Sequence, residues 1–273
     1  MKIGNKEFDL DKRIYVMGIL NVTPDSFSDG GKFCNLDEAL RRVEQMISEG
    51  VDIIDVGGES TRPNYTRISE EEESKRVVPV IEGIKKRFDI PISIDTYKGK
   101  VAESSLAAGA DLINDIWGLK QDTRMAQVIA EYDVPVCIMH NRKEVDYSNF
   151  MEDVKSDLKM SLDIAQKAGI KRDKLIIDPG IGFAKTYEMN LILMNRLDEL
   201  QQFGLPILLG TSRKSVIGLT LSEPVENRLE GTIATSVMGV MKGCNFVRVH
   251  DVLENLRAIR MTEAIMKEHK QEG

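Results

Sequence analysis

The most constraining feature of this sequence is a short apolar run that recurs eight times and ends each time in polar residues. The first run begins at Ile14, and the other seven span residues 51–56, 91–95, 111–116, 134–140, 174–178, 205–210 and 245–250. The runs are rich in β-branched residues and show no polar alternation. Both properties are typical of strands that are buried on both faces.

A helical pattern follows the runs. Residues 35–50 have a possible cap at Asn35, apolar residues at helical spacing and a closing Gly50. Ser69 precedes an acidic first turn, which suits a helix N-terminus. Further helices are expected at about 150–168, at 187–202 and from residue 252. Strands that alternate with helices pair in parallel.

Eight such units in 273 residues predict a single (β/α)8 barrel domain over residues 1–273. A doubly wound open sheet is the alternative. It is less favoured because no GxGxxG pattern follows the first strand. The loops after strands one and two are longer than the usual 2–6 or so residues, so they are candidate lids over the barrel mouth.

Nearly every predicted strand ends in a polar or charged residue. These residues are Asn21, Asp55, Asp95, Asn114, Asp115, His140, Asp178, Arg248 and His250. In a barrel all of these strand ends converge on one face, where active sites lie. The pattern therefore predicts a site at that face.

The chemistry of these residues suits two kinds of ligand group. Asp95, Asn114 and Asp178 offer acceptors and an amide, which suit a flat heterocycle with several N–H donors. Cationic groups suit an anion, and they are found at Arg62, Lys214, Arg248 and His250. Arg248 and His250 are two residues apart on a strand, so both point the same way. Residues 212–215 are expected to open a helix whose free N–H groups add to the anion site.

Composition excludes several classes of protein. A net charge of −7 and a pI of about 5.2 argue against a nucleic-acid surface, although a local basic cluster can still bind a small anion. No apolar stretch approaches a membrane span and no leader pattern is present, so a cytosolic protein is expected. Three widely spaced cysteines with no CxxC predict reduced thiols rather than disulfides or zinc.

A series of motifs along the chain resembles the dihydropteroate synthase family. The motifs run in order from about residue 14 to residue 252, and they read MGILNVTPDSFSDGG, GGESTRP, SIDTYK, INDI, IDPGIGFAKT, GTSRKS and VRVHDV. The resemblance implies an enzyme of folate biosynthesis. It would join 6-hydroxymethyl-7,8-dihydropterin diphosphate to p-aminobenzoate, releasing diphosphate and 7,8-dihydropteroate.

The resemblance also implies residue roles for the pterin diphosphate. The pterin would be held by Asp95, Asn114, Asp178, Lys214 and Arg248, the last of which stacks on its face. The diphosphate would be held by Asn21, Arg62, Arg248 and His250, with Asn21 also a ligand of Mg²⁺. The catalytic residues implied are Asp29, Arg62, Lys214 and His250.

For the second substrate, the resemblance implies a p-aminobenzoate pocket formed by Thr61, Pro63, Phe183 and Ser215. It further implies closure of the first loop, which carries Asp29, and a homodimer. Diphosphate departure before amine attack is the order expected, because the pterin ring can delocalise the positive charge left on its methylene. The arylamine is neutral at pH 7, so no strong general base is required. Asn64 and Trp117 depart from the family pattern, and neither is among the implied anchors.

Two other functions use the same barrel. One is a pterin-binding methyltransferase module, which acts with a corrinoid protein and needs no diphosphate-binding residues. The other is a non-catalytic pterin-binding protein, which would be expected to have lost Asn21, Asp29 or Arg62. The presence of these three residues favours the synthase.

Overall fold

Eight parallel strands form one sheet in the order β8-β7-β6-β5-β4-β3-β10-β9. The computed structural model describes residues 1–22, 32–59 and 67–268, with only the backbone at 32–35. The strands are β3 Tyr15–Asn21, β4 Ile53–Gly57, β5 Ile92–Asp95, β6 Leu112–Asp115, β7 Val136–Met139, β8 Leu175–Asp178, β9 Leu208–Leu209 and β10 Phe246–Val249.

The sheet closes on itself between β8 and the residues just before β9. Ile177 and Ile207 form a parallel bridge, and the amide of Ile177 donates to the carbonyl of Pro206 at 2.9 Å. The predicted (β/α)8 barrel is therefore confirmed. Strand β9 is shorter than the predicted 205–210, because Pro206 has no N–H to donate to a ladder.

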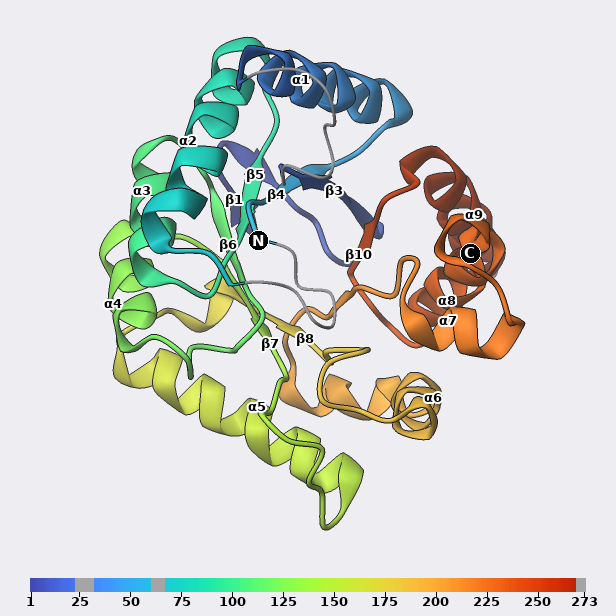
Figure 1. Ribbon diagram of the computed structural model, residues 1–273. Coiled ribbons are helices and arrows are strands. Elements are labelled where there is room, and N and C mark those ends of the chain that lie inside the picture. Colours follow the sequence, from blue (N-terminus) through green and yellow to red (C-terminus); the bar gives the residue numbers. More distant parts are fainter. Residues whose placement is uncertain (23–31, 60–66, 269–273) are drawn as a thin grey trace.

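Helices surround the barrel on its outer side (Figure 1). Their bounds are α1 Lys32–Glu49, α2 Glu70–Arg87, α3 Gly99–Ala107, α4 Thr123–Tyr132, α5 Phe150–Lys167, α6 Tyr187–Asn195, α7 Ser215–Leu221, α8 Leu229–Met241 and α9 Val252–Met266. Short 3₁₀ helices are η2 Arg172–Lys174, η3 Leu197–Phe203 and η4 Val225–Asn227. Within the described ranges, no helix has the length and apolar character needed to cross a membrane.

The helix starts follow the sequence in one case and depart from it in another. Ser69 caps α2 as predicted, and its side-chain oxygen accepts from the amide of Glu72 at 3.1 Å. Helix α1 instead begins at Lys32, so the prediction that Asn35 is its cap is wrong. Lysine and phenylalanine tolerate helical backbone, which lets the helix start before Asn35.

The helix predicted over 187–202 is divided. Helix α6 stops at Asn195, and Arg196 leaves helical geometry before η3 begins at Leu197. The tighter 3₁₀ turns change the period from 3.6 to about three residues. This change keeps Leu197 and Leu200 fully buried beside the end of α6.

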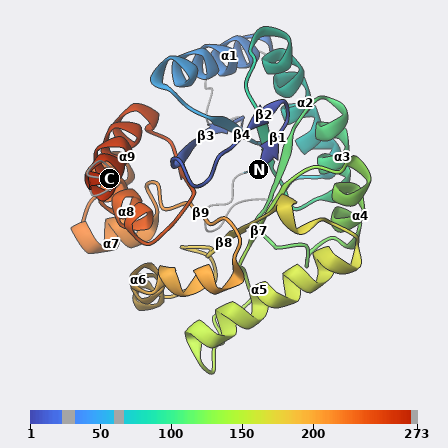
Figure 2. The same ribbon diagram turned by 180° about the vertical axis from the view of Figure 1, so that it is seen from behind.

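The chain begins with a hairpin that the sequence did not predict, formed by β1 Lys2–Ile3 and β2 Lys6–Glu7. Figure 2 shows the hairpin across one end of the barrel. Ile3 and Phe8 are buried there against the first inward side chains of the barrel strands, which are Tyr15, Met17, Ile53, Leu112, Cys137, Ile176, Leu208 and Phe246. These residues form an apolar floor that closes the barrel opposite its C-terminal mouth.

Candidate active site

A layer of polar side chains lies directly above this apolar floor. Successive side chains of a strand point to opposite faces, so the residue two positions after a floor residue also points inward. Four inward-pointing polar residues each lie two positions after a floor residue: Asp55 after Ile53, Asn114 after Leu112, Asp178 after Ile176 and Arg248 after Phe246. The same spacing after buried Ser93 gives Asp95. The strands therefore bring five predicted strand-end residues together inside the barrel mouth.

Arg248 is at the centre of this layer. Its Nε donates to Oδ2 of Asp55 at 2.5 Å, and its Nη2 donates to Oδ2 of Asp95 at 2.6 Å. Asn114 donates from Nδ2 to the same Asp55 oxygen at 3.3 Å. Asp55 is completely buried, and its Oδ1 has no hydrogen-bond partner in the described part of the chain.

Burial shifts the ionisation of this layer. It raises the pKa of Asp95 to about 7, although Arg248 opposes the shift, and it raises the pKa of Asp178 against the attraction of Lys214. Burial also lowers the pKa of Lys214 to about 8. For Arg248, burial lowers the pKa but Asp55 and Asp95 raise it, and the net direction is upward. The layer is therefore suited to a ligand that brings N–H donors to its carboxyl groups.

The loop after β8 joins three of the predicted site residues. Oδ1 of Asp178 accepts from the amide of Gly180 at 2.7 Å. Lys214 reaches this loop from the far side, where its Nζ donates to the carbonyl of Ile181 and lies 4.5 Å from the centre of the Phe183 ring. Asp178, Phe183 and Lys214 therefore share one wall of the mouth.

The loops after β9 and β10 are joined by two side-chain contacts. Ser212 Oγ lies 2.9 Å from Nδ1 of His250, and the guanidinium of Arg213 forms a two-pronged pair with Asp251 at 2.5 and 3.0 Å. Because Asp251 is paired with Arg213, Ser212 and His250 do not form a Ser–His–Asp triad with it. Ser215 is the first residue of α7 and is exposed.

The remaining predicted residues divide into two groups. Asn21 ends β3 at the mouth, where a Cβ placed on Gly57 would lie 3.6 Å from its Oδ1 and 3.7 Å from the Cβ of Asp95. Four others lie outside the described residues, namely Asp29, Thr61, Arg62 and Pro63. Their roles stay predictions, as does the effect of Asn64.

The structure also identifies residues that the sequence reasoning did not assign to the site. The sequence pattern identifies Asp55 only as a strand-end residue, yet Asp55 binds Arg248 directly. Its spacing of two residues from inward-pointing Ile53 is the signal that could have placed it in the site. Glu59, Glu73 and Lys98 form a buried cluster behind the mouth, in which the Lys98 ammonium lies 2.7 and 2.5 Å from the two carboxylates. Ile68 donates from its amide to Glu59 at 2.8 Å, so the cluster fixes the chain on both sides of residues 60–66.

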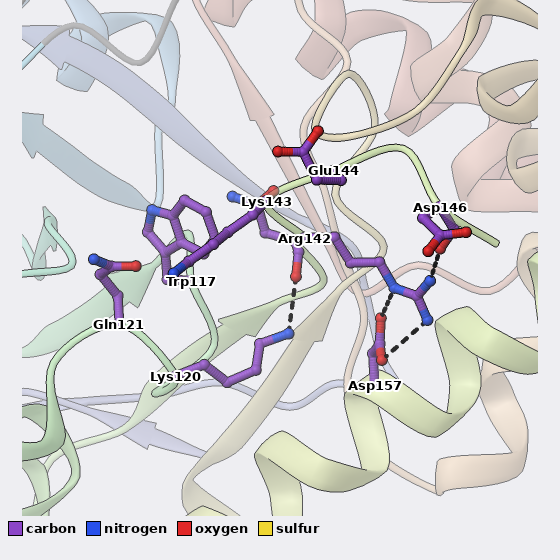
Figure 3. A pocket seen from close by; sticks show the side chains of 9 residues that line it. Trp117, Lys120, Gln121, Arg142, Lys143, Glu144, Asp146 and Asp157 are labelled. Carbon is purple, nitrogen blue, oxygen red and sulfur yellow. Dashed lines mark hydrogen bonds and ion pairs between the residues drawn. The ribbon is translucent and has the colours of Figure 1, made fainter.

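A separate cavity of about 390 Å³ lies beside the mouth, between the loops after β6 and β7 (Figure 3). Trp117 forms part of its wall, and the lining includes three cationic residues (Lys120, Arg142, Lys143) and three acidic ones (Glu144, Asp146, Asp157). Among these residues the Arg142 guanidinium points toward Asp146 and Asp157 (Figure 3). The predicted anchors Asp95, Asn114 and Asp178 are not among its lining residues, so the polar layer of the barrel is the better candidate site.

The described residues limit how a metal ion could be bound at the mouth. In residues 1–22, 32–59 and 67–268, no group of three His, Cys, Asp or Glu side chains could hold a metal ion. Mg²⁺ accepts one or two protein oxygens when phosphates and waters complete its shell. The amide oxygen of Asn21 fits that requirement. Cys137 and Cys244 are buried free thiols.

Comparison with known proteins identifies the chain. The model of the pterin binding enzyme family matches residues 17–250. A dihydropteroate synthase of Clostridium beijerinckii is 62% identical over 268 residues, which cover 98% of this chain and 100% of that protein. The chain belongs to the dihydropteroate synthase family.

Solved structures of this family share the fold of this chain. A dihydropteroate synthase from Clostridium difficile, crystallised in the presence of pteroic acid, matches with a TM-score of 0.94 and 54% identity, covering 96% of this chain and 100% of that one. A Xanthomonas albilineans dihydropteroate synthase with 4-aminobenzoic acid matches with a TM-score of 0.89 and 40% identity, covering 94% of each chain. Dihydropteroate synthases are transferases of small-molecule substrates, and the relatives named above are all synthases of this kind.

Proposed function

We propose that this protein joins 6-hydroxymethyl-7,8-dihydropterin diphosphate to p-aminobenzoate, giving 7,8-dihydropteroate and diphosphate. The observation that carries the proposal is that Asp95, Asn114 and Asp178 lie together inside the mouth of the barrel. The chain that forms this barrel matches a dihydropteroate synthase along its length. These groups suit the amide and amino edge of a pterin. The structures solved with pteroic acid and 4-aminobenzoic acid support the two ligand classes.

The pterin is held in the polar layer. Its N–H donors pair with the carboxyl groups of Asp95 and Asp178, Asn114 provides an amide, and Lys214 donates from the wall formed with Phe183. Because the Arg248 guanidinium now contacts Asp95, pterin binding has to share or replace that contact. Arg248 is then free to stack on the pterin face and to reach the diphosphate.

The diphosphate lies nearer the rim, where Asn21, Arg62, Arg248 and His250 hold it. Bound Mg²⁺ would supply charge neutralisation for the leaving diphosphate, with Asn21 as its protein ligand. The hydrogen bond to Ser212 orients the His250 ring. His250 lies two residues beyond Arg248, nearer the rim, and this position suits binding of a terminal phosphate. These groups stabilise the negative charge that develops on the leaving oxygen.

The p-aminobenzoate lies between Phe183 and the start of α7, in a pocket shared with Thr61, Pro63 and Ser215. Asp29 and Arg62 act from the first and second loops as these close over the substrates. The bond between the pterin methylene and the diphosphate oxygen breaks first, and its electron pair leaves with the oxygen. The amine lone pair then forms the new C–N bond, and the nitrogen releases one proton to water.

The test is to mix the protein with the dihydropterin diphosphate and Mg²⁺, with and without p-aminobenzoate, and to follow dihydropteroate and diphosphate. Dihydropteroate that depends on both substrates supports the proposed reaction, and loss of activity with EDTA supports Mg²⁺. Positional isotope exchange in the diphosphate without p-aminobenzoate supports departure before attack. Pterin binding without product would refute the synthase assignment.

We also propose that the protein is a homodimer. Four exposed aliphatic side chains on two adjacent helices support this assembly: Leu191 and Ile192 on α6, and Leu219 and Leu221 on α7. The helices are joined by the Tyr187 and Thr220 hydroxyls at 3.1 Å. Sedimentation should give a dimer that Leu219→Glu dissociates, and a monomeric wild type would refute it. The cytoplasmic location stays a prediction, which cell fractionation tests.

A further inference from the structure

The turn after β8 is held in an unusual backbone conformation. Gly180, Gly182 and Ala184 have φ angles of +71°, +83° and +45°. Alanine rarely adopts a positive φ, so Ala184 stores strain that other contacts have to offset. The turn also carries Ile181 and Phe183, the two residues that contact the Lys214 ammonium. Its shape therefore determines where that ammonium lies.

Lys185 holds this turn from inside. Its Nζ lies 2.8 Å from the carbonyl oxygen of Gly180, 2.9 Å from that of Phe183 and 2.9 Å from Nδ1 of His140. Burial lowers the pKa of Lys185, while three acceptors around Nζ favour the ammonium form, which has one proton for each of them. Two of the partners are the first and last residues of the four-residue turn 180–183, so one side chain fixes both of its ends.

His140 is itself fixed by the next shell of the network. Its Nε2 lies 3.0 Å from Oδ2 of Asp157, and the Arg142 guanidinium donates to the same carboxylate at 2.5 and 3.3 Å (Figure 3 shows Arg142 and Asp157). The Asp157 carboxylate can only accept, so Nε2 carries the imidazole proton and donates a hydrogen bond to it, which leaves Nδ1 to accept from Lys185. Burial lowers the pKa of His140 to about 4, which keeps the ring neutral at pH 7.

We propose that Lys185 is a positioning residue, oriented by His140, that holds the 180–183 turn so that Ile181 and Phe183 present Lys214 to the pterin. The inference rests on the proposed function and deepens it. Lys185 touches none of the reacting atoms in this role. It acts through the turn, while Asp178 holds the same turn from the opposite side by accepting from the amide of Gly180.

The experiment compares Lys185→Met with Tyr147→Phe in the full-length protein. Tyr147 donates to the carbonyl of Ala184 at 2.9 Å, so Tyr147→Phe removes one hydrogen bond from the same loop and leaves the Lys185 contacts intact. Lys185→Met should weaken pterin binding, measured by calorimetry, and raise the KM for p-aminobenzoate by about 10- to 100-fold each, the range expected when a charged hydrogen-bond donor is lost. Tyr147→Phe should leave both constants within about twofold.

The Nδ1 atom of His140 gives a readout that a general loss of stability would not move. Two-dimensional ¹⁵N NMR of the wild type should show Nε2 protonated and Nδ1 accepting a hydrogen bond. In Lys185→Met, Asp157 should keep the proton on Nε2, while the Nδ1 resonance should move to the higher shift of a nitrogen that accepts no hydrogen bond. If Lys185→Met is not obtained folded, Lys185→Gln replaces it, because one amide group cannot serve all three acceptors. Unchanged binding constants in a folded variant, or equal losses in Tyr147→Phe, would overturn the proposal. A wild type that forms no dihydropteroate would instead overturn the proposed function.

Discussion

The Nη2 atom of Arg248 lies 2.6 Å from Oδ2 of Asp95, on residues that are 153 positions apart in the chain. The cation that is expected to face the diphosphate is therefore paired with a carboxyl group that is expected to hold the pterin. The second half of the guanidinium is held by Asp55 at 2.5 Å. Arg248 can leave Asp95 and keep one carboxylate partner, which lowers the cost of its movement when pterin enters.

The ionisation of Asp95 predicts how pterin binding depends on pH. Burial raises the pKa of Asp95 to about 7, so the carboxylate form increases as the pH rises through 7. Since N–H donors prefer the carboxylate, pterin affinity should rise from pH 6 to pH 7.5. Burial lowers the pKa of Lys214 to about 8, so affinity should fall again above pH 8. Calorimetric titration of pterin at each pH measures both parts of this profile: the rise in affinity up to pH 7.5, which we call the acidic limb, and the fall above pH 8.

Asp95→Asn provides the control for this assignment. It removes the group that titrates near pH 7, so the acidic limb should disappear while the loss above pH 8 remains. Pterin affinity should also be lower than that of the wild type at pH 7.5. An unchanged acidic limb in Asp95→Asn would assign that limb to another group.

Asp178→Asn should affect pterin binding far more than folding. The amide oxygen can still accept from Gly180, so the local turn is kept. The variant loses the negative charge and one acceptor, which should weaken pterin binding roughly 10- to 100-fold. Calorimetry measures the binding and urea denaturation measures the stability. Wild-type pterin affinity in a folded Asp178→Asn would contradict the predicted role.

His250→Ala should slow turnover through the diphosphate site. We expect kcat to fall roughly 10- to 100-fold, because a group that stabilises charge on the leaving oxygen is removed. Ser212→Ala is the matched comparison, since it removes the hydroxyl that lies 2.9 Å from Nδ1 of His250 and keeps the ring. Its effect on kcat should be smaller. Full activity of His250→Ala would show that His250 is structural.

Lys98→Met should destabilise the protein strongly. It leaves Glu59 and Glu73 buried without their shared cation, and the loss of one member of a buried ion pair costs about 3–5 kcal/mol in the free energy of unfolding. Lys100→Met breaks the exposed pair with Glu71 and should cost less than about 1 kcal/mol. Urea denaturation at pH 7.5 compares the two variants.

The pH dependence of Lys98→Met gives a second check. Burial already raises the pKa of Glu73, and without Lys98 the pKa of Glu73 should rise further. A raised pKa favours protonation in the folded state, so the deficit of Lys98→Met relative to the wild type should shrink as the pH falls from 7.5 to 5. A deficit that is constant with pH would mean that lost packing, rather than unpaired charge, causes the destabilisation.

The sequence by itself determined the order of strands and helices, the barrel and the ring of polar strand ends. Those features follow from local period and composition, because an apolar β-branched run has to be buried and its inward residues recur at every second position. The local pattern alone therefore places Asp95, Asn114, Asp178 and Arg248 at one face of the barrel.

Only the tertiary structure decided which of these groups contact one another. Arg248 with Asp55, Lys185 with His140 and the Phe8 contact with the barrel floor all join residues that are far apart in sequence. Each partner could have been satisfied by several other groups or by water, and no local pattern distinguishes those choices. Closure of the barrel removes water and brings particular side chains within hydrogen-bonding distance. The choice of partners is therefore a property of the packed barrel.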